Sequence, residues 1–133
     1  MKSMNVDALM RELESVALPQ SKDFMIKQKA VADKYHVSLV AYEAGQHLVG
    51  VGPDQNDATL NALFDAANRD PRMGSLYTRY LNDWADAGGG LLMHFTHCAA
   101  YSKFGRFGSL EYMTQPRSHA PKYDALLRFL ESH

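Results

Sequence analysis

Ser38-Leu-Val-Ala-Tyr-Glu-Ala-Gly-Gln-His-Leu48 is the most informative segment of this chain. Its apolar residues suit a buried strand, which we predict over residues 37–43. Glu43 then falls where such a strand leaves the core, and Gln46 and His47 follow closely. Catalytic groups of parallel α/β proteins gather at the carboxyl ends of strands. Glu43 is therefore a candidate functional carboxylate, with pairing to a Lys or Arg as the alternative. Gln46 and His47 would orient it or bind hydroxyls, unless they serve only loop hydrogen bonding.

Apolar residues at helical spacing flank this strand on both sides. They predict helices over residues 6–17 and 21–35, a helix carrying residues 60–67, a long helix from Pro71 to the glycines at 88–90, and a last helix from Pro121. We expect Leu18-Pro19-Gln20 to separate the first helix from the second. Asn56 or Asp57 is the expected N-cap of the third helix.

A second apolar run predicts a strand over residues 91–96, followed by a long aromatic loop over residues 98–115. Because helices separate the two strands, we expect parallel pairing through a right-handed crossover. Both strands are apolar on both faces, as in a covered parallel sheet. Two strands alone make a marginal sheet, so either further strands are hidden in the sequence or another copy completes the sheet. We therefore expect a homo-oligomer, with a dimer that exchanges elements as its simplest form.

Length and composition fit one globular α/β domain over residues 1–133, with 46% hydrophobic and 22% charged residues. A net charge of −1 without a run of Lys or Arg argues against a nucleic-acid partner. No apolar run approaches the ~20 residues that span a membrane. The N-terminal segment has no signal-peptide pattern, and the single Cys98 cannot form an internal disulfide. A cytoplasmic location is the expectation, unless an upstream leader was lost.

Three further segments carry a family resemblance. Residues 39–48 look like the strand-seven region of clan A glycoside hydrolases, which are (β/α)8 barrels with a nucleophilic glutamate at the end of that strand. Residues 90–96 resemble strand eight, residues 101–112 resemble the loop after it that borders the sugar cleft, and residues 121–127 resemble the closing helix. The likeness runs from about Ser21 to the end. It is closest to bacterial proteins described as cellulose-binding or glycosidase-like.

The resemblance implies roles for individual residues. Glu43 would be the nucleophile, and Gln46, His47 and His94 would lie in the cleft. Exposed aromatic side chains of the Gly-rich loop would stack on pyranose rings, with simple loop packing as the alternative; these side chains are Tyr101, Phe104 and Phe107. The expected fold is a βαβα unit with additional N-terminal helices, equivalent to the last quarter of a barrel and completed by oligomerisation.

The chain also departs from the clan. A (β/α)8 barrel takes ~250 residues, about twice the 133 present here. The acid/base glutamate of the clan follows an asparagine, and this sequence contains no Asn-Glu pair. Glu111 and the Glu43 of a second copy are the only candidates for the second carboxylate. We expect a fragment, a truncated gene product or a small protein that assembles. We expect a carbohydrate-related function, with a single chain that is not a complete catalyst. The alternative is a non-enzymatic module that binds carbohydrate or serves in assembly.

Metal and cofactor sites are not expected. His94, His97 and Cys98 are close in sequence, but the spacing of the two histidines on a strand predicts rings on opposite faces. Zinc sites also need three or four ligands. Gly50-Val-Gly52 lacks the third glycine and the strand–helix context of a dinucleotide site.

Overall fold

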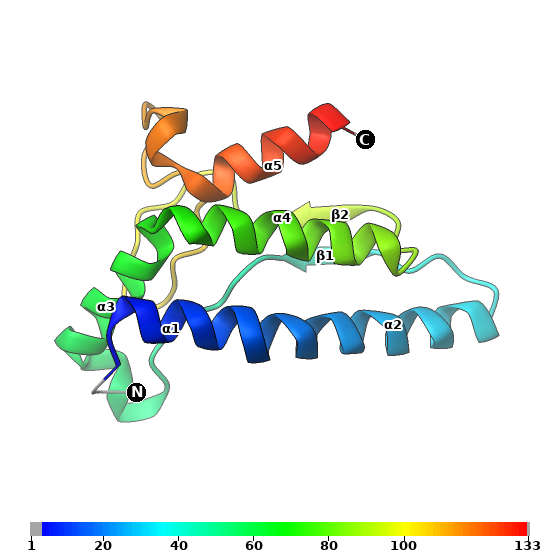
Figure 1. The fold of residues 1–133 in the computed structure, drawn as a ribbon, viewed down its shortest axis with the longest axis horizontal. Helices are drawn as coiled ribbons and strands as arrows, with labels where there is room; N and C mark the ends of the chain where they lie inside the picture. The colour runs from blue at the N-terminus through cyan, green and yellow to red at the C-terminus, as the bar shows by residue number, and fades with distance from the viewer. Residues whose placement is uncertain (1–3, 133) are drawn as a thin grey trace.

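The computed structural model describes residues 4–132, so residues 1–3 and 133 of the expected domain lie outside it. The fold is α/β, rich in helix, with one two-stranded parallel sheet. Figure 1 shows a long N-terminal helix with α4 lying alongside it and the sheet behind them. The elements in chain order are α1 (Val6–Glu12), η1 (Leu13–Ala17), α2 (Leu18–Lys34), β1 (Ala41–Ala44), η2 (Gly52–Asn56), α3 (Ala58–Arg69), α4 (Pro71–Asp86), β2 (Leu92–His94), η3 (Arg117–His119) and α5 (Pro121–Ser132).

The N-terminal helices run on as one rod, and the predicted break at residues 18–20 was wrong. A π-helical turn, η1, joins α1 directly to α2, and the Leu18 N–H donates to the carbonyl of Leu13, five residues back. Pro19 follows in the first turn of α2. Proline has no N–H and crowds the carbonyl of the preceding turn. The wider π turn absorbs this interruption without ending the helix.

Capping residues fix the starts of the helices around the sheet. Asp57 accepts a hydrogen bond from the Leu60 N–H at 3.0 Å, which selects it over Asn56 as the cap of α3. Asp70 caps α4 in the same way, with Pro71 in the first turn. Both carboxylates satisfy N–H groups that a helix leaves unpaired at its start. The predicted position of these two helices is confirmed.

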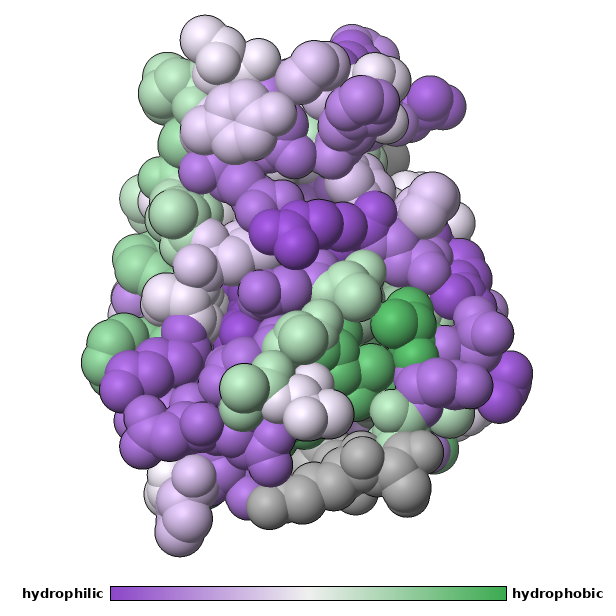
Figure 2. Space-filling model, turned by 90° about the vertical axis from the view of Figure 1, so that its left-hand side faces the viewer, coloured by the Kyte–Doolittle hydropathy of each residue, from purple (hydrophilic) through white to green (hydrophobic). Residues whose placement is uncertain are grey.

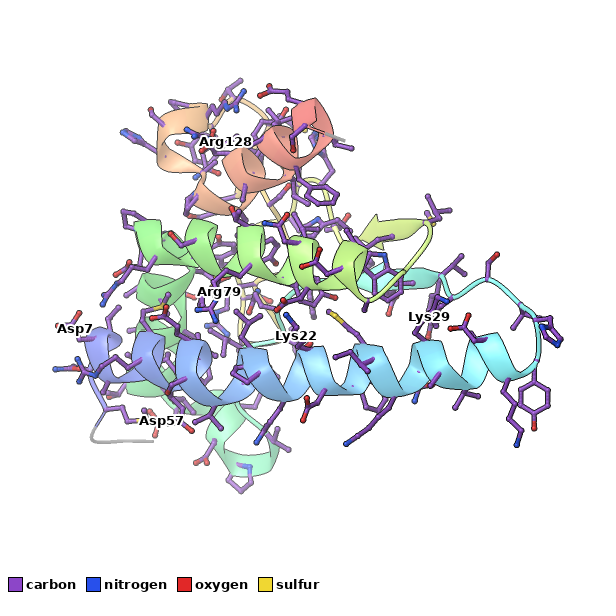
Figure 3. The ribbon with its side chains drawn as sticks, turned by 45° about the vertical axis from the view of Figure 1, so that its right-hand side comes forward. Asp7, Lys22, Lys29, Asp57, Arg79 and Arg128 are labelled. Atoms are coloured by element: carbon purple, nitrogen blue, oxygen red, sulfur yellow. The ribbon has the colours of Figure 1, made fainter. Side chains whose placement is uncertain are left out.

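Ion pairs tie the N-terminal rod to α4. Lys22 lies 2.6 Å from Asp83, and Arg79 lies 2.9 Å from Glu14. Figure 3 shows Lys22 and Arg79 in the space between the two helices. Exposed pairs of this kind are worth little individually, so they fix the register of the helices more than they stabilise the fold. Within the described residues, no helix is long and apolar enough to cross a membrane.

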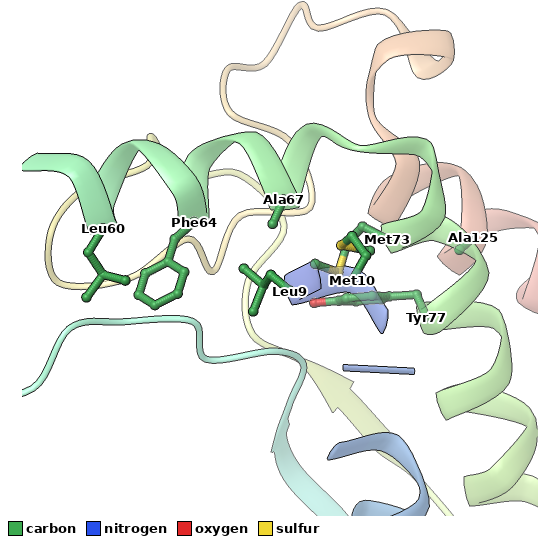
Figure 4. Packing of buried hydrophobic residues seen from close by; sticks show 8 residues of the cluster. All are labelled: Leu9, Met10, Leu60, Phe64, Ala67, Met73, Tyr77 and Ala125. Atoms are coloured by element: carbon green, nitrogen blue, oxygen red, sulfur yellow. The ribbon is translucent and has the colours of Figure 1, made fainter. Parts of the chain in front are cut away.

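The hydrophobic core lies where α1, α3 and α4 meet, beside the amino end of α5. Figure 4 shows the two α1 side chains beside those of α3 and α4. The cluster comprises Leu9, Met10, Leu60, Phe64, Ala67, Met73, Tyr77 and Ala125, all nearly inaccessible to solvent. The core therefore forms at one end of the helical layer and does not extend over the far face of the sheet.

The sheet is parallel, as predicted, and is shorter than expected. Ala41 pairs with Leu92 and Ala44 pairs with His94, so β1 contains one residue more than β2 between these pairs. Ala44 is buried on the helix side. On the other face Tyr42 is 82% exposed and Met93 is 56% exposed. The expectation that both faces are covered was therefore wrong for a single chain, and residues 4–132 form no closed barrel.

Two cationic side chains are completely buried next to the core, Arg106 at 1% exposure and Lys122 at 0%. Arg106 Nε lies 2.6 Å from Asp65, and its Nη2 donates to Asn61. The Lys122 ammonium donates to Asn68 Oδ1 at 2.9 Å and to the Arg106 carbonyl at 2.6 Å. Burial lowers the pKa of Lys122 to about 7, because an ammonium is hard to desolvate.

Lys122 makes stability depend on pH in a defined direction. Its ordinary pKa of 10.5 applies to the unfolded chain, which therefore binds more protons than the folded chain above pH 7. The free energy of unfolding should rise between pH 7 and pH 10.5. In Lys122→Met this rise should shrink, and in the control Lys27→Met, at an exposed position, it should persist. Urea unfolding across this range measures both. If the free energy of unfolding rose equally with pH in the parent chain and in Lys122→Met, the lowered pKa of Lys122 would be contradicted.

Candidate functional site

The carboxyl end of β1 turns sharply at Gly45. This residue has φ +137°, and a Cβ there would lie 3.1 Å from the Tyr77 hydroxyl oxygen and 3.3 Å from His94 Nε2. Glycine is the residue that tolerates both the backbone conformation and the close approach. The next residue is then held by its backbone, since the Gln46 N–H donates to the Tyr77 oxygen at 3.1 Å.

The Gln46 side chain connects the loop after β1 with the loop after β2. Its Nε2 donates to the Arg106 carbonyl at 2.6 Å, and its Oε1 accepts from the Leu48 N–H at 2.8 Å. Both ends of the amide are therefore engaged within the protein. The structure supports loop hydrogen bonding for Gln46 and gives it a positioning role at the carboxyl end of the sheet.

Three rings meet beyond the carboxyl ends of the strands, and we call His47, Phe95 and Phe107 the aromatic cluster. The Phe107 ring lies 5.0 Å from that of His47 and 5.3 Å from that of Phe95, centroid to centroid. His47 is exposed and Phe95 is 45% exposed. Tilted and edge-to-face pairs at these separations are favourable. The cluster presents aromatic surface to solvent where parallel sheets place their sites.

Glu43 lies at the same end of the sheet as this cluster. It is exposed, and its carboxylate has no hydrogen bond or ion pair within residues 4–132. The Phe95 N–H donates to the carbonyl of Ala44 at 2.9 Å, which brings the start of the second loop next to the end of β1, one residue after Glu43. The arrangement thus puts a free carboxylate and an exposed aromatic ring at the same end of the sheet.

His94 lies on the other face of the sheet. It pairs with Ala44, and side chains of directly paired residues share a face, whereas Glu43 precedes Ala44 and points the opposite way. His94 Nε2 lies 3.4 Å from the Tyr77 hydroxyl on α4. The structure therefore does not bring His94 and Glu43 into one opening.

Burial lowers the pKa of His94 to about 4, with smaller effects from the positive charges of Lys122 and His97. His94 is therefore neutral near pH 7. His94 and His97 line the same groove, so the expectation of rings on opposite faces was wrong, because β2 ends at His94 and the chain turns there. In the part of the chain that the structure describes, no group of three or more His, Cys, Asp or Glu side chains could hold a metal ion.

The remaining predicted residues lie in different surroundings. Tyr101 is half-buried, with Lys122 Nζ 4.7 Å and Arg69 Cζ 5.3 Å from the centre of its ring, so it packs inside the loop. Phe104 is 61% exposed at the tip of a tight turn. Glu111 forms two hydrogen bonds with Arg69, at 2.7 and 2.5 Å, and lines a different cavity from the aromatic cluster. It is not placed to work with Glu43.

Comparisons with protein families, with curated proteins and with solved structures give no match to this chain.

Sequence reasoning missed Phe95 and Lys122. Phe95 belongs to the predicted second strand, where alternation gives every other residue to the far face, and its position at the end of that strand was the available signal. Lys122 had no signal, because a lysine near the start of an amphipathic helix is normally solvated. Only the packing of the loop over the helix buries it.

The state of His94 can be measured directly. We expect its ring protons to titrate with a pKa of about 4 in NMR spectra, below the ordinary 6.5. In Lys122→Met the pKa should increase, since a nearby positive charge that opposes protonation is removed. Spectra of the unfolded chain in urea provide the reference. A His94 pKa near 6.5 in the folded protein would rule out the buried, neutral imidazole.

Proposed function

We propose that this chain is a glycosidase-like part of a (β/α) barrel that binds carbohydrate without hydrolysing it. The observation that carries the proposal is the exposed aromatic cluster beside the unpaired Glu43 at the carboxyl end of β1 and β2. The family resemblance of these two strands agrees with it, and the comparisons neither add to it nor oppose it.

The chemistry of the site suits a sugar. Aromatic faces bury the apolar C–H surface of a pyranose ring, and a carboxylate accepts hydrogen bonds from hydroxyl groups. Glu43 has its acceptor positions free for such bonds. Phe107 is backed by Gly105, whose missing side chain leaves room for the ring. The platform is therefore held in place before a ligand arrives, which lowers the entropic cost of binding.

Hydrolysis needs a second carboxyl group, and residues 4–132 of a single chain pair none with Glu43. Retaining glycosidases hold the two groups ~5–5.5 Å apart, and inverting enzymes hold them ~6.5–9.5 Å apart. Glu111, the candidate within the same chain, is bound to Arg69 and lines another cavity. The other candidate, the Glu43 of a second copy, is available only in an assembly. A nucleophile without an acid leaves the departing oxygen unprotonated.

A second function is favoured by a separate observation. The apolar far face of the sheet is open in the single chain, which supports an assembly role. Binding and assembly are compatible, because the aromatic cluster lies at the carboxyl end of the strands and not on their free edges.

We expect little or no turnover of aryl glycosides by the purified chain. General acid catalysis typically contributes ~10²–10⁴-fold, and this site has no positioned acid. A release assay with nitrophenyl glycosides measures the rate, with Glu43→Gln as the control. Strong turnover that disappears in Glu43→Gln would contradict the proposal. Turnover that survives the substitution would come from another site or a contaminant.

Binding should depend on the phenylalanine rings of the aromatic cluster. With cellohexaose as the probe, Phe107→Ala and Phe95→Ala should each weaken binding by about 2- to 10-fold, as expected for a lost aromatic contact. Phe104→Ala tests whether the turn tip contributes. Tyr112→Ala removes an exposed ring that lines a different cavity and is the matched control.

Isothermal titration calorimetry measures these affinities. Near-ultraviolet circular dichroism shows whether each variant keeps its fold. Equal affinities for the parent chain, Phe95→Ala and Phe107→Ala would refute the aromatic platform. Binding of α-linked hexaoses in place of cellohexaose would keep the platform and change only the sugar class.

A further inference from the structure

Four large apolar side chains lie on the open face of the sheet. Val40 and Tyr42 come from β1 and the residue before it, and Leu91 and Met93 come from β2 and the residue before it. Each is more than half exposed. Leu91 and Met93 alternate with Leu92 and His94 along β2. In β1 the extra residue places Tyr42 and Glu43 side by side on this face, so the Glu43 carboxylate borders the apolar patch at its carboxyl end. Figure 2 shows hydrophobic side chains along the left margin of the molecule, the side that lies at the back of Figure 1. Exposed apolar patches of this kind mark interaction surfaces.

Both outer edges of the sheet are also unpaired, since each strand has one neighbour among residues 4–132. A groove of about 690 Å³ runs along the β2 edge, between β2, α4 and α5. Apolar side chains of α5 line it, including Leu126, Leu127 and the 73% exposed Leu130. α5 therefore stands over the place where another strand would pair with β2.

The β1 edge has a corresponding stripe of small and apolar side chains on η1 and α2. Ala17 and Ser21 line a cavity together with residues 45–48, directly after β1. Phe24 and Val31 continue the same helical stripe and are 64% and 52% exposed. Figure 1 agrees, with β1 on the α2 side of the sheet and β2 on the α5 side. Each copy thus carries one edge of each kind.

We propose that copies of this chain associate head to tail, with the free edge of β2 in one copy pairing in parallel with the free edge of β1 in the next, and that four copies close an eight-stranded barrel. This contact places β1 of one copy in the groove under α5 and β2 of the other beside the α2 stripe. A single kind of interface therefore covers both flanks. A two-fold contact between two β2 edges would be antiparallel and would leave the α2 stripe exposed.

Four copies are expected because the interior of a barrel must be filled by side chains, and four copies supply eight strands. Eight strands give an interior just wide enough to be filled by side chains. In (β/α)8 barrels the filling comes in layers of four, contributed by alternate strands. Four copies of this chain would form such layers from identical residues, with four Met93 from the β2 strands and four Tyr42 from the β1 strands. The open sheet face then becomes the interior.

The surface area of the chain agrees with a missing partner. Its accessible surface is 8066 Å². A folded monomer of 14.9 kDa is expected to expose about 7,000 Å². The excess of about 1,000 Å² corresponds to about one standard interface, in which each partner buries ~800 Å², whereas a copy in the ring makes two such contacts.

Sedimentation equilibrium tests the assembly. The parent chain should show a mass near four times the 14.9 kDa chain mass at micromolar concentration. Met93→Lys should shift it toward monomer, because a charge in the interior cannot be solvated. Met113→Lys makes the same change at a 70% exposed loop position and should leave the tetramer intact. A parent chain that stays monomeric, or an assembly unaffected by Met93→Lys, would overturn the proposal.

A mixing experiment tests the direction of the contact. Phe24→Lys blocks the β1 edge and Leu130→Lys blocks the β2 edge, so each variant alone should be monomeric. Mixed in equal amounts they retain one intact interface and should stop at a heterodimer, seen by native mass spectrometry. Dimers of Phe24→Lys alone, with no uptake of Leu130→Lys, would instead show a two-fold contact and refute the head-to-tail arrangement.

The ring also deepens the carbohydrate proposal, and this part depends on the proposed function. Four aromatic clusters would share one mouth, so a polysaccharide would be held by several sites at once. We expect parent chain to bind soluble cellulose derivatives about 10-fold or more tightly than Leu130→Lys, with equal affinity for cellohexaose. Equal polysaccharide affinities would refute the shared mouth. Loss of all sugar binding with the tetramer intact would refute the proposed function alone.

Discussion

The backbone oxygen of Arg106 accepts two hydrogen bonds at 2.6 Å, one from Gln46 Nε2 and one from Lys122 Nζ. These bonds join the loop after β1, the loop after β2 and the start of α5 at one atom. The Lys122 ammonium has left water completely, so its bonds to Asn68 and Arg106 are the interactions that offset the loss of solvation. This node and the bonds from Gln46 to Tyr77 and from Thr96 to Phe107 fix both loops at the end of the sheet.

The aromatic cluster depends on that node. Phe107 directly follows Arg106, and His47 directly follows Gln46, so fixing the two polar residues also fixes the two rings. The polar residues Gln46 and Arg106 thus position the loops, and the rings of His47 and Phe107 form the surface that faces solvent. A positioning role explains why Gln46 has no free hydrogen-bonding group, although its place in the sequence indicated a ligand contact.

The open sheet face is the second constraint on this fold. Helices cover one face only, because the hydrophobic core gathers where α1, α3 and α4 meet and contributes nothing to the far side. Tyr42 and Met93 therefore stay in solvent in a single chain. The same sequence pattern that predicts a doubly covered strand becomes, in one copy, an exposed apolar surface.

Local sequence determined the helix starts at Asp57 and Asp70 and the location of Glu43 at a strand end. It also determined the parallel pairing of two strands separated by helices. Caps, turns and periodicity act over a few residues, so the sequence shows them directly. Tertiary structure decided the rest. The burial of Lys122 depends on a loop that folds over it. The opposite placement of Glu43 and His94 depends on strand register. Each of these is set by contacts between residues far apart in the chain, which no local pattern records.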